Sequence, residues 1–471
     1  MNSSSEVYRS GGLVALIITT ISSFLIPFMG ISTIIALPAI GRDFQMNAVT
    51  LAWVTTAYIL TSAALLVPLG RLSDIRGRKI IFLSGYVIFF FGSVISAMAS
   101  TGALFLASRA VQGIGSAAIL STSIAILTAA FPKNHRGRVI GITTAAVYIG
   151  LSVGPVLGGL LTEYLGWRSI FWGSSLLCLM MTVAVLWKLP EYTETRKEPF
   201  DLAGTVIYSG SLMVTMYGLS ILPDGAGAGM IAVGIVGAAL FVWWEKRTPV
   251  PLVDFRLFIG NRGFTFSSLA ALVHYSGTWA IIFLLSLFLQ YAKDLTPGKA
   301  GLILITSPVV QAVFSPIFGR LSDRIEPRLL ASVGMAVTAI GIGLLVFVTA
   351  ATSTIYIITT LVIIGFGFAL FSSPNTNAIM SSIDQRSYGF ASATVGTMRQ
   401  LGMTLSMGMT MVVFALVIGK VEITPEHYPS FITSVRILFL ISSLLCFSAI
   451  FPSMARGKIH EEISSSNDSR A

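Results

Sequence analysis

Long runs of apolar residues follow one another along the whole chain, separated by short polar segments. Crossing a hydrocarbon core of about 30 Å takes roughly 20 apolar residues in a helix, and a helix satisfies its own backbone hydrogen bonds in lipid. The runs lack the alternation of polar and apolar positions found in barrel strands, so we predict helices and exclude a β-barrel. The fourteen predicted spans are residues 13–38, 51–69, 80–98, 103–130, 139–161, 170–186, 202–221, 226–244, 264–289, 300–318, 329–350, 355–371, 390–418 and 432–451.

The charged positions between the spans predict how the chain is oriented. An even number of spans places both termini on one side of the membrane. With the N-terminus in the cytosol, 22 of the 30 Lys and Arg residues fall in cytosolic segments, six fall outside, and Arg109 and Arg399 lie within spans. Because basic residues concentrate on the cytosolic side, we predict that both termini are cytosolic.

Composition agrees with a membrane protein and removes other classes. The 471 residues are 54% hydrophobic and 11% charged, which excludes a soluble globular domain. The net charge of +10 follows from the orientation, with attraction to anionic lipid as a by-product, so no nucleic-acid partner is expected. Two cysteines in separate spans are too few for a disulfide framework or a metal site, and no cofactor is expected. The first span lacks a small-residue cleavage site and is expected to be retained.

A repeated segment indicates an internal duplication. Residues 70–74 (GRLSD) return unchanged at 319–323, and the two copies are separated by eight spans instead of six. We therefore predict two six-helix bundles with an extra hairpin between them that either faces lipid or forms a dimer contact. The predicted units are an N-terminal bundle (1–190), an inserted transmembrane hairpin with linkers (191–254), a C-terminal bundle (255–455) and a polar cytosolic tail (456–471).

Both copies of the repeat lie where an apolar run ends. The first copy ends with the carboxylate of Asp74, at a helix end and among arginine side chains. A carboxylate in such surroundings can exchange its guanidinium partners when two bundles rock. The alternative is an ordinary basic loop with a tight turn. The second copy lacks the Gly-Arg-Lys ending, so its role is less defined. The predicted conformational latch consists of Gly70, Asp74, Gly77, Arg78, Gly319 and Asp323.

Two further motifs lie inside spans four and five. Arg109 stands in an apolar run at a cost of about 2.5–3.5 kcal/mol, so we expect it to face a cavity or partner, with Gln112 one turn away. The alternative is that Arg109 extends to the outer surface. In span five, glycines at every fourth position predict close helix approach, and a proline favours a bend. The motif residues are Gly150, Gly154, Pro155, Gly158 and Gly159.

Over nearly its whole length the chain resembles the fourteen-span drug:proton antiporter branch of the major facilitator superfamily. Residues 70–79 (GRLSDIRGRK) match the loop between spans two and three of that family. Residues 109–115 (RAVQGIG) match its arginine-containing motif, and residues 150–159 (GLSVGPVLGG) match its antiporter signature. The resemblance implies alternating access between two bundles, export of hydrophobic or amphipathic compounds and exchange for protons. Short loops favour a prokaryotic cytoplasmic membrane.

One departure from the family concerns proton coupling. Gly30 stands in span one where the branch often carries Asp, and none of the 20 Asp and Glu residues lies at mid-membrane. His274 of span nine is a candidate proton carrier, because imidazole titrates near neutral pH; packing is the alternative. Glu163 is a second candidate, although its place near the outer end of span five favours an ion pair with Arg168.

Polar residues of the second half are expected on the transport pathway. They are Arg399 and Gln400 of span thirteen, with Asn375, Thr376 and Asn377, which follow span twelve. The alternative for Arg399 is a gate cation near the cytosolic surface. If Arg109 and Arg399 both faced a cavity, its positive field would suit neutral or anionic substrates. A permease for an organic anion or another small solute is therefore the main alternative to export. A membrane receptor without transport is a remote one, and the sequence holds no enzyme motif. The expected partners are a small-molecule substrate, protons and the bilayer.

Overall fold

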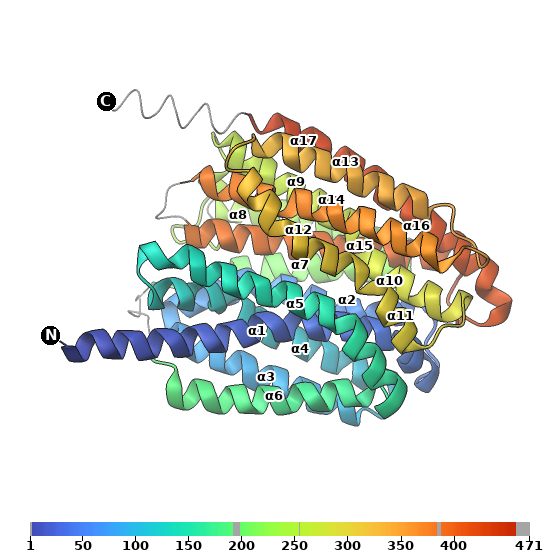
Figure 1. Cartoon of the computed structure of the whole chain (residues 1–471), viewed down its shortest axis with the longest axis horizontal. Helices are drawn as coiled ribbons and strands as arrows, with labels where there is room; N and C mark the ends of the chain where they lie inside the picture. Colours follow the sequence, from blue (N-terminus) through green and yellow to red (C-terminus); the bar gives the residue numbers. More distant parts are fainter. Residues whose placement is uncertain (1, 192–197, 254, 384–387, 458–471) are drawn as a thin grey trace.

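The computed structural model describes residues 2–191, 198–253, 255–383 and 388–457, and these residues are helical apart from short connections (Figure 1). Fourteen helical segments are long and apolar enough to cross a membrane, which confirms the predicted number. Most of the predicted tail, from residue 458 on, lies outside the described residues.

The helices run side by side, and the described part of the chain begins and ends at the same end of the molecule (Figure 1). The first six helices are α1 (Asn2–Asp43), α2 (Ala48–Arg76), α3 (Arg78–Met98), α4 (Gly102–Ala130), α5 (Lys133–Leu165) and α6 (Arg168–Lys188). The hairpin is α7 (Leu202–Ile221) and α8 (Gly225–Glu245). The remaining elements are η1 (Phe255–Leu257), α9 (Arg262–Thr278), α10 (Ala280–Leu287), η2 (Phe288–Ala292), α11 (Pro297–Leu304), α12 (Thr306–Leu321), α13 (Pro327–Leu345), α14 (Thr354–Ser381), α15 (Tyr388–Val417), η4 (Pro425–His427), α16 (Tyr428–Ser448) and α17 (Ile450–Ala455).

Contacts sort the helices into two bundles. The largest within the first bundle join α3 to α4, α1 to α5 and α2 to α4. In the second bundle, α14 packs on α13 and α12, and α9 packs on α15 and α16. The domain boundaries named above stay a prediction, since only the helix packing bears on them.

Local capping explains where several helices begin. Asn47 precedes α2, and its Oδ1 accepts a hydrogen bond from the Thr50 backbone N–H at 2.8 Å. Thr296 caps α11 in the same way, and Pro297 takes the first helical position, where its missing N–H costs nothing. Both caps lie in the connections at the end of the molecule away from the termini (Figure 1).

Two predicted spans contain breaks that the apolar pattern did not reveal. Span nine is interrupted at Trp279, where the backbone N–H of Ala280 donates to Ser406 Oγ of α15 at 3.1 Å. A side chain inserted into the helical ladder disrupts a helix in this way. Span ten is interrupted at Ile305, because Pro308 has no N–H to donate to the Leu304 carbonyl.

The inserted hairpin bridges the two bundles. The Tyr208 hydroxyl of α7 donates to the Ala63 carbonyl of α2 at 3.1 Å, and Ser209 Oγ donates to the Ala64 carbonyl at 2.7 Å. The same helix also packs on α15 of the second bundle. The hairpin is therefore part of the junction between the bundles, while apolar residues of α8 such as Val236, 67% exposed, face outward.

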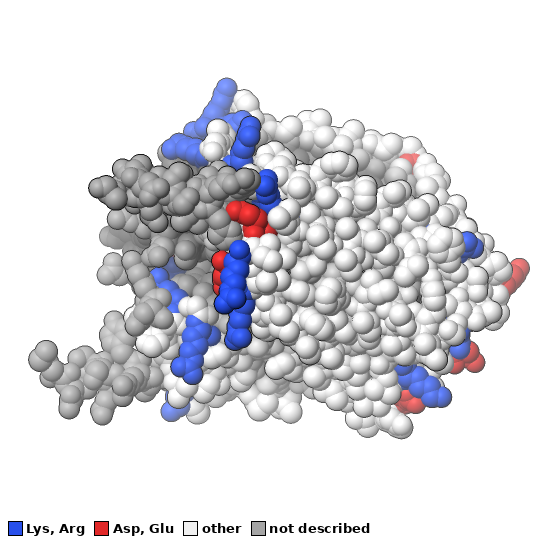
Figure 2. All heavy atoms as spheres, turned by 45° about the horizontal axis from the view of Figure 1, so that its top comes forward, with Lys and Arg blue, Asp and Glu red and all other residues white. Residues whose placement is uncertain are grey.

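Charged side chains gather at the two ends of the molecule, with an uncharged band between them on the face drawn in Figure 2. Lys and Arg are denser at the end that holds the termini (Figure 2). This distribution is typical of a protein that crosses a bilayer.

Candidate functional site between the two bundles

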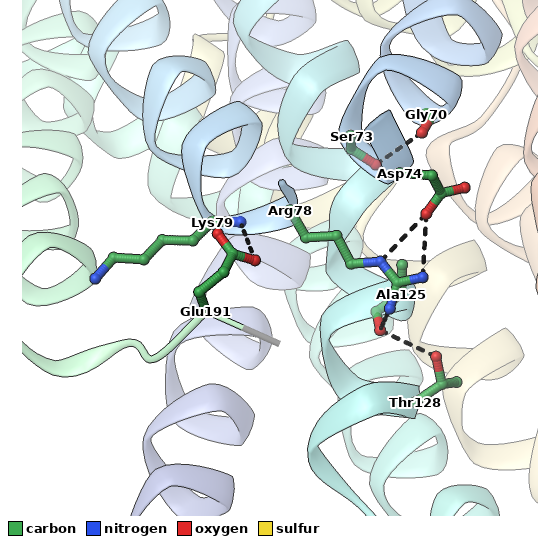
Figure 3. A network of polar contacts seen from close by, with 8 residues as sticks. All are labelled: Gly70, Ser73, Asp74, Arg78, Lys79, Ala125, Thr128 and Glu191. Atoms are coloured by element: carbon green, nitrogen blue, oxygen red, sulfur yellow. Dashed lines mark hydrogen bonds and ion pairs between the residues drawn. The ribbon is translucent and has the colours of Figure 1, made fainter. Parts of the chain in front are cut away.

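The conformational latch forms a tight turn between α2 and α3. Gly77 has φ +108°, a conformation that favours glycine. Arg78 donates from Nε and Nη2 to Asp74 Oδ1 at 3.3 and 3.1 Å, and from Nη1 to the Ala125 carbonyl of α4 at 3.0 Å (Figure 3). In this conformation the Asp74 carboxylate is paired within its own turn, and Arg78 ties that turn to α4. Its role as a latch stays a prediction.

The second copy of the repeat folds locally like the first. Ser73 Oγ donates to the Gly70 carbonyl at 2.7 Å, and Ser322 Oγ donates to the Gly319 carbonyl at the same distance. The second turn has no counterpart of Arg78.

Instead, the amide of Asn377 on α14 holds the second turn. It donates to Ser322 Oγ at 2.9 Å and to Asp323 Oδ1 at 3.3 Å. Asn375 donates to the Ser267 carbonyl of α9 at 3.1 Å. Both side chains thus join helices of the second bundle, and their place on the transport pathway stays a prediction.

Arg109 is buried inside the first bundle with 1% of its surface exposed, so the alternative that it extends to the outer surface is wrong. Its guanidinium donates to the Gln112 side-chain oxygen and to the Val54 carbonyl of α2, and it lies 4.6 Å from the centre of the Tyr58 ring. Gln112 in turn donates to Ser93 Oγ of α3 at 2.8 Å. These contacts join α2, α3 and α4. The place of Arg109 and Gln112 on the transport pathway stays a prediction.

His274 lies inside the second bundle. Its ring centre is 4.0 Å from that of Phe371 and 5.1 Å from that of Phe368, both on α14. Within the described residues, neither ring nitrogen has a hydrogen-bond partner. The side chain thus packs among aromatic rings, and its role in proton coupling stays a prediction.

The glycine stripe of α5 faces α1. A Cβ atom added to Gly150 would lie 2.5 Å from the Phe24 carbonyl oxygen, and one added to Gly158 would lie 2.6 Å from Ser32 Cα. Ser32 Oγ donates to the Gly154 carbonyl at 3.1 Å. The close helix approach predicted from the glycine spacing is present, and it lies within the first bundle.

The other side of the same motif faces the second bundle, a contact that the glycine spacing does not reveal. A Cβ atom added to Gly159 would lie 2.4 Å from the Pro297 carbonyl oxygen. One added to Gly301 of α11 would lie 2.1 Å from the Pro155 carbonyl oxygen. The backbones of α5 and α11 therefore touch directly, and they do so near the end of the molecule away from the termini.

Glu163 extends this crossing. Its Oε2 accepts a hydrogen bond from the Gly298 backbone N–H at 2.9 Å, at the N-terminus of α11, where a negative charge is favoured. The predicted pair with Arg168 is wrong, because Arg168 instead donates to Asp43 Oδ2 at the end of α1, at 2.9 Å. The side of α5 that carries Glu163 faces α11 of the second bundle, whereas Arg168 begins α6.

Near the middle of the helices, polar side chains connect the bundles. Gln400 of α15 donates from Nε2 to Ser62 Oγ of α2 at 2.8 Å. Ser315 of α12 donates to the Tyr148 hydroxyl of α5 at 3.5 Å. These two contacts join helices of different bundles, and the place of Gln400 on a transport pathway stays a prediction.

Arg399 lies beside Gln400 and is half-buried. The Tyr275 hydroxyl of α9 faces the Arg399 guanidinium and the Ser372 hydroxyl. The ion pairs within the described residues join Arg71 to Glu198, Arg78 to Asp74, and Arg168 to Asp43, and none of them includes Arg399. Arg399 therefore adds a positive charge next to the Gln400 contact between the bundles.

A bundle–hairpin–bundle arrangement with these motifs agrees with the family comparison. The family model described as Major Facilitator Superfamily matches residues 19–407, with a second match over residues 267–462. The chain belongs to the major facilitator superfamily. The resemblance and the helical membrane fold predicted from the sequence are thus confirmed, and this member of the superfamily is a transporter.

Relatives within the superfamily differ in what their names say they transport. The riboflavin transporter RibZ of Clostridioides difficile is 29% identical over 92% of this chain and 95% of its own. The multidrug resistance protein Stp of Mycobacterium tuberculosis is 30% identical over 83% of this chain and 74% of its own. The cephamycin export protein CmcT of Amycolatopsis lactamdurans is 28% identical, covering 96% of both chains.

A solved structure supports the fold. A bacterial homologue of the human lysosomal transporter Spinster, in an inward-facing and unoccupied conformation, superimposes with a TM-score of 0.70. It covers 96% of this chain and 97% of its own, at 15% identity.

Proposed function

We propose that this chain exports hydrophobic or amphipathic compounds across the cell membrane by alternating access, in exchange for protons. The observation that supports it most directly is the crossing of α5 and α11, where Gly159 and Gly301 bring the backbones of two bundles into contact. Contacts between small residues separate without disturbing large side chains, as rocking bundles require. Similarity to proteins named for resistance and export supports the direction of transport.

We infer that both termini are cytosolic, because basic residues concentrate at their end of the molecule. The α5–α11 crossing then lies near the outer side of the membrane. In this assignment the conformation described here is closed toward the outside.

The surroundings of Gly30, which stands where the branch often carries an acid, support proton binding at another place in the chain. A Cβ atom added to Gly30 would meet no other atom within 4 Å, so there is open space where relatives of the branch often carry a carboxylate. A lipophilic cation would find no acidic counter-charge at this point. The proton has to be bound elsewhere, and His274 and Glu163 are the candidates named from the sequence.

A neutral or anionic solute is the second candidate substrate. Arg399 faces Tyr275 on the surface between the bundles, and the charge of its guanidinium would attract an anion. The similarity to a riboflavin transporter agrees with an uptake function of this kind.

Transport by purified protein in liposomes separates the two candidates. We expect a fluorescent lipophilic dye to move when a pH gradient is imposed, to reverse with the sign of the gradient, and to stop without it. Movement that ignores the gradient would exclude proton exchange, and a lack of any dye movement would exclude the proposed export.

An anionic dye in the same liposomes tests the role of Arg399. If this residue binds anions, Arg399→Gln should slow transport of the anionic dye about tenfold, which corresponds to one charge-assisted hydrogen bond. The matched control is Lys420→Gln, an exposed cation near the far end of the molecule that should leave the rate unchanged. An equal rate in both variants would remove Arg399 from the pathway.

Glu163 should favour closure at the α5–α11 crossing. In Glu163→Ala the Gly298 N–H loses its acceptor, so we expect the fraction of closed molecules to fall about threefold to tenfold. Spin labels on cysteines introduced at Met98 and Phe347, 66% and 69% exposed near this end of the two bundles, would report the separation. The native cysteines, Cys178 and Cys446, are buried.

The control for this variant is Glu426→Ala, which removes an exposed carboxylate at the same end of the molecule. It should leave the distance distribution unchanged. If Glu163→Ala also leaves it unchanged, the hydrogen bond to Gly298 does not contribute to closure.

A further inference from the structure

Two carboxyl groups meet at the base of the inserted hairpin. Asp201 caps α7, with its Oδ1 accepting from the Gly204 N–H at 2.8 Å, and both of its oxygens accept from the Trp244 indole N–H at 3.2 Å. Glu245 ends α8, and its Oε2 accepts from the Val253 N–H at 3.0 Å. Asp201 therefore joins the start of the hairpin to its end, and Glu245 joins that end to the segment that follows it.

Glu245 is 3% exposed, and its other oxygen, Oε1, has no hydrogen-bond partner within the described residues. This oxygen points toward Asp201. A Cβ atom added to Gly204 would lie 2.2 Å from Asp201 Oδ2 and 2.8 Å from Glu245 Oε1, so both oxygens line the same small space. The two carboxyl groups are therefore neighbours in the fold.

Such an arrangement is unfavourable while both groups are ionised, because like charges repel and a buried acceptor lacks a donor. One proton removes both problems, since it replaces the repulsion with an O–H···O hydrogen bond. Pairs of close carboxyl groups hold a proton at pH values where isolated ones are ionised.

Within the described residues, Asp201 is the charged side chain that acts on Glu245. Two cations near the base of the hairpin contact other groups. Arg71 of α2 pairs with Glu198 at 2.6 Å, and the Arg247 guanidinium lies 4.1 Å from the centre of the Trp243 ring. We propose that Asp201 and Glu245 form a proton-binding site that holds one shared proton and keeps the two ends of the hairpin together.

The site lies close to the helices of the two bundles that move relative to each other in alternating access. The hairpin contacts α2 and α15 of the two bundles, and Glu198, three residues before Asp201, pairs with Arg71 inside the first repeat. Loss of the proton would push the base of the hairpin apart close to the conformational latch. The site thus offers a place for a proton in a chain without a mid-membrane acid, and it does not depend on the substrate or on the direction of transport.

Infrared spectroscopy of the purified full-length protein tests the proposal. At about pH 6 an isolated Asp or Glu side chain is ionised. We expect the wild type to show a protonated carboxylic acid band at this pH, and both Asp201→Asn and Glu245→Gln to lose it, because each removes one member of the pair. Asn caps a helix as well as Asp, so the first variant keeps the start of α7.

Asp224→Asn is the matched control, because Asp224 caps α8 at the opposite end of the hairpin by accepting from the Ala226 N–H at 3.2 Å. This variant should keep the band. Absence of the band from the wild type would overturn the proposal whether or not the variants fold. Loss of the band in the control, or its survival in both pair variants, would also overturn it.

Discussion

Replacing Gly159 with valine is expected to abolish transport while leaving the first bundle folded. The added Cβ would lie 2.4 Å from the Pro297 carbonyl oxygen, and the backbone of α11 cannot move aside while the two bundles stay in contact. Overpacking of this kind costs about 1–3 kcal/mol, and the branched side chain places this variant at the upper end. The closed population should therefore fall at least tenfold, and a transporter that cannot close on one side cannot complete its cycle.

The distance between spin labels at Met98 and Phe347 would show this shift directly, and the dye assay would show the loss of transport. Gly141→Val is the control on the same helix, because an added Cβ at Gly141 meets no other atom within 4 Å. Wild-type distances in Gly159→Val would mean that the α5–α11 crossing does not limit closure.

The neighbouring replacement, Gly158→Val, is expected to have a different effect. An added Cβ at Gly158 would lie 2.6 Å from Ser32 Cα of α1, inside the first bundle. This clash can be relieved only if α1 and α5 separate, and it is present in every conformation of the transporter. We expect loss of stability instead of a shift between states. The melting temperature should fall by about 5 °C or more, and the yield of folded protein should fall with it.

Thermal unfolding of the two purified variants side by side measures this difference, again with Gly141→Val as the control. Gly158→Val should melt well below the wild type, whereas Gly159→Val should melt close to it. Equal melting temperatures would contradict the assignment of the two glycines to different interfaces.

The sequence predicted the number of spans, the fold and the glycine packing of α5, because these follow from local patterns. The prediction of a membrane span depends only on the length and apolar content of a run of residues. Glycines at every fourth position necessarily lie on one face of a helix. The turn at Gly77 was likewise readable from its residue type. Each of these features needs no knowledge of which helix lies opposite.

Contacts between distant segments could not be read in this way. Glu163 was assigned to Arg168 because the two are close in sequence, but the rotation of α5 turns its carboxylate toward Gly298, 135 residues away. For Arg109 the sequence predicted a cavity or a partner, with the outer surface as the alternative. It could not say that the partners are a carbonyl and an aromatic ring of α2. Single-residue breaks such as the one at Trp279 depend on a partner side chain from another helix.

The unequal attachment of the hairpin suggests how lipid is kept out of the moving junction. Two side-chain hydrogen bonds join α7 to α2. On the other side, Leu219 and Met216 of α7 pack against Gly408 of α15, where an added Cβ would lie 2.9 Å and 3.1 Å from these two side chains. We expect α7 to travel with α2 while α15 glides along its apolar side chains. The hairpin would then act as a sliding seal that prevents acyl chains from wedging between the halves as they tilt.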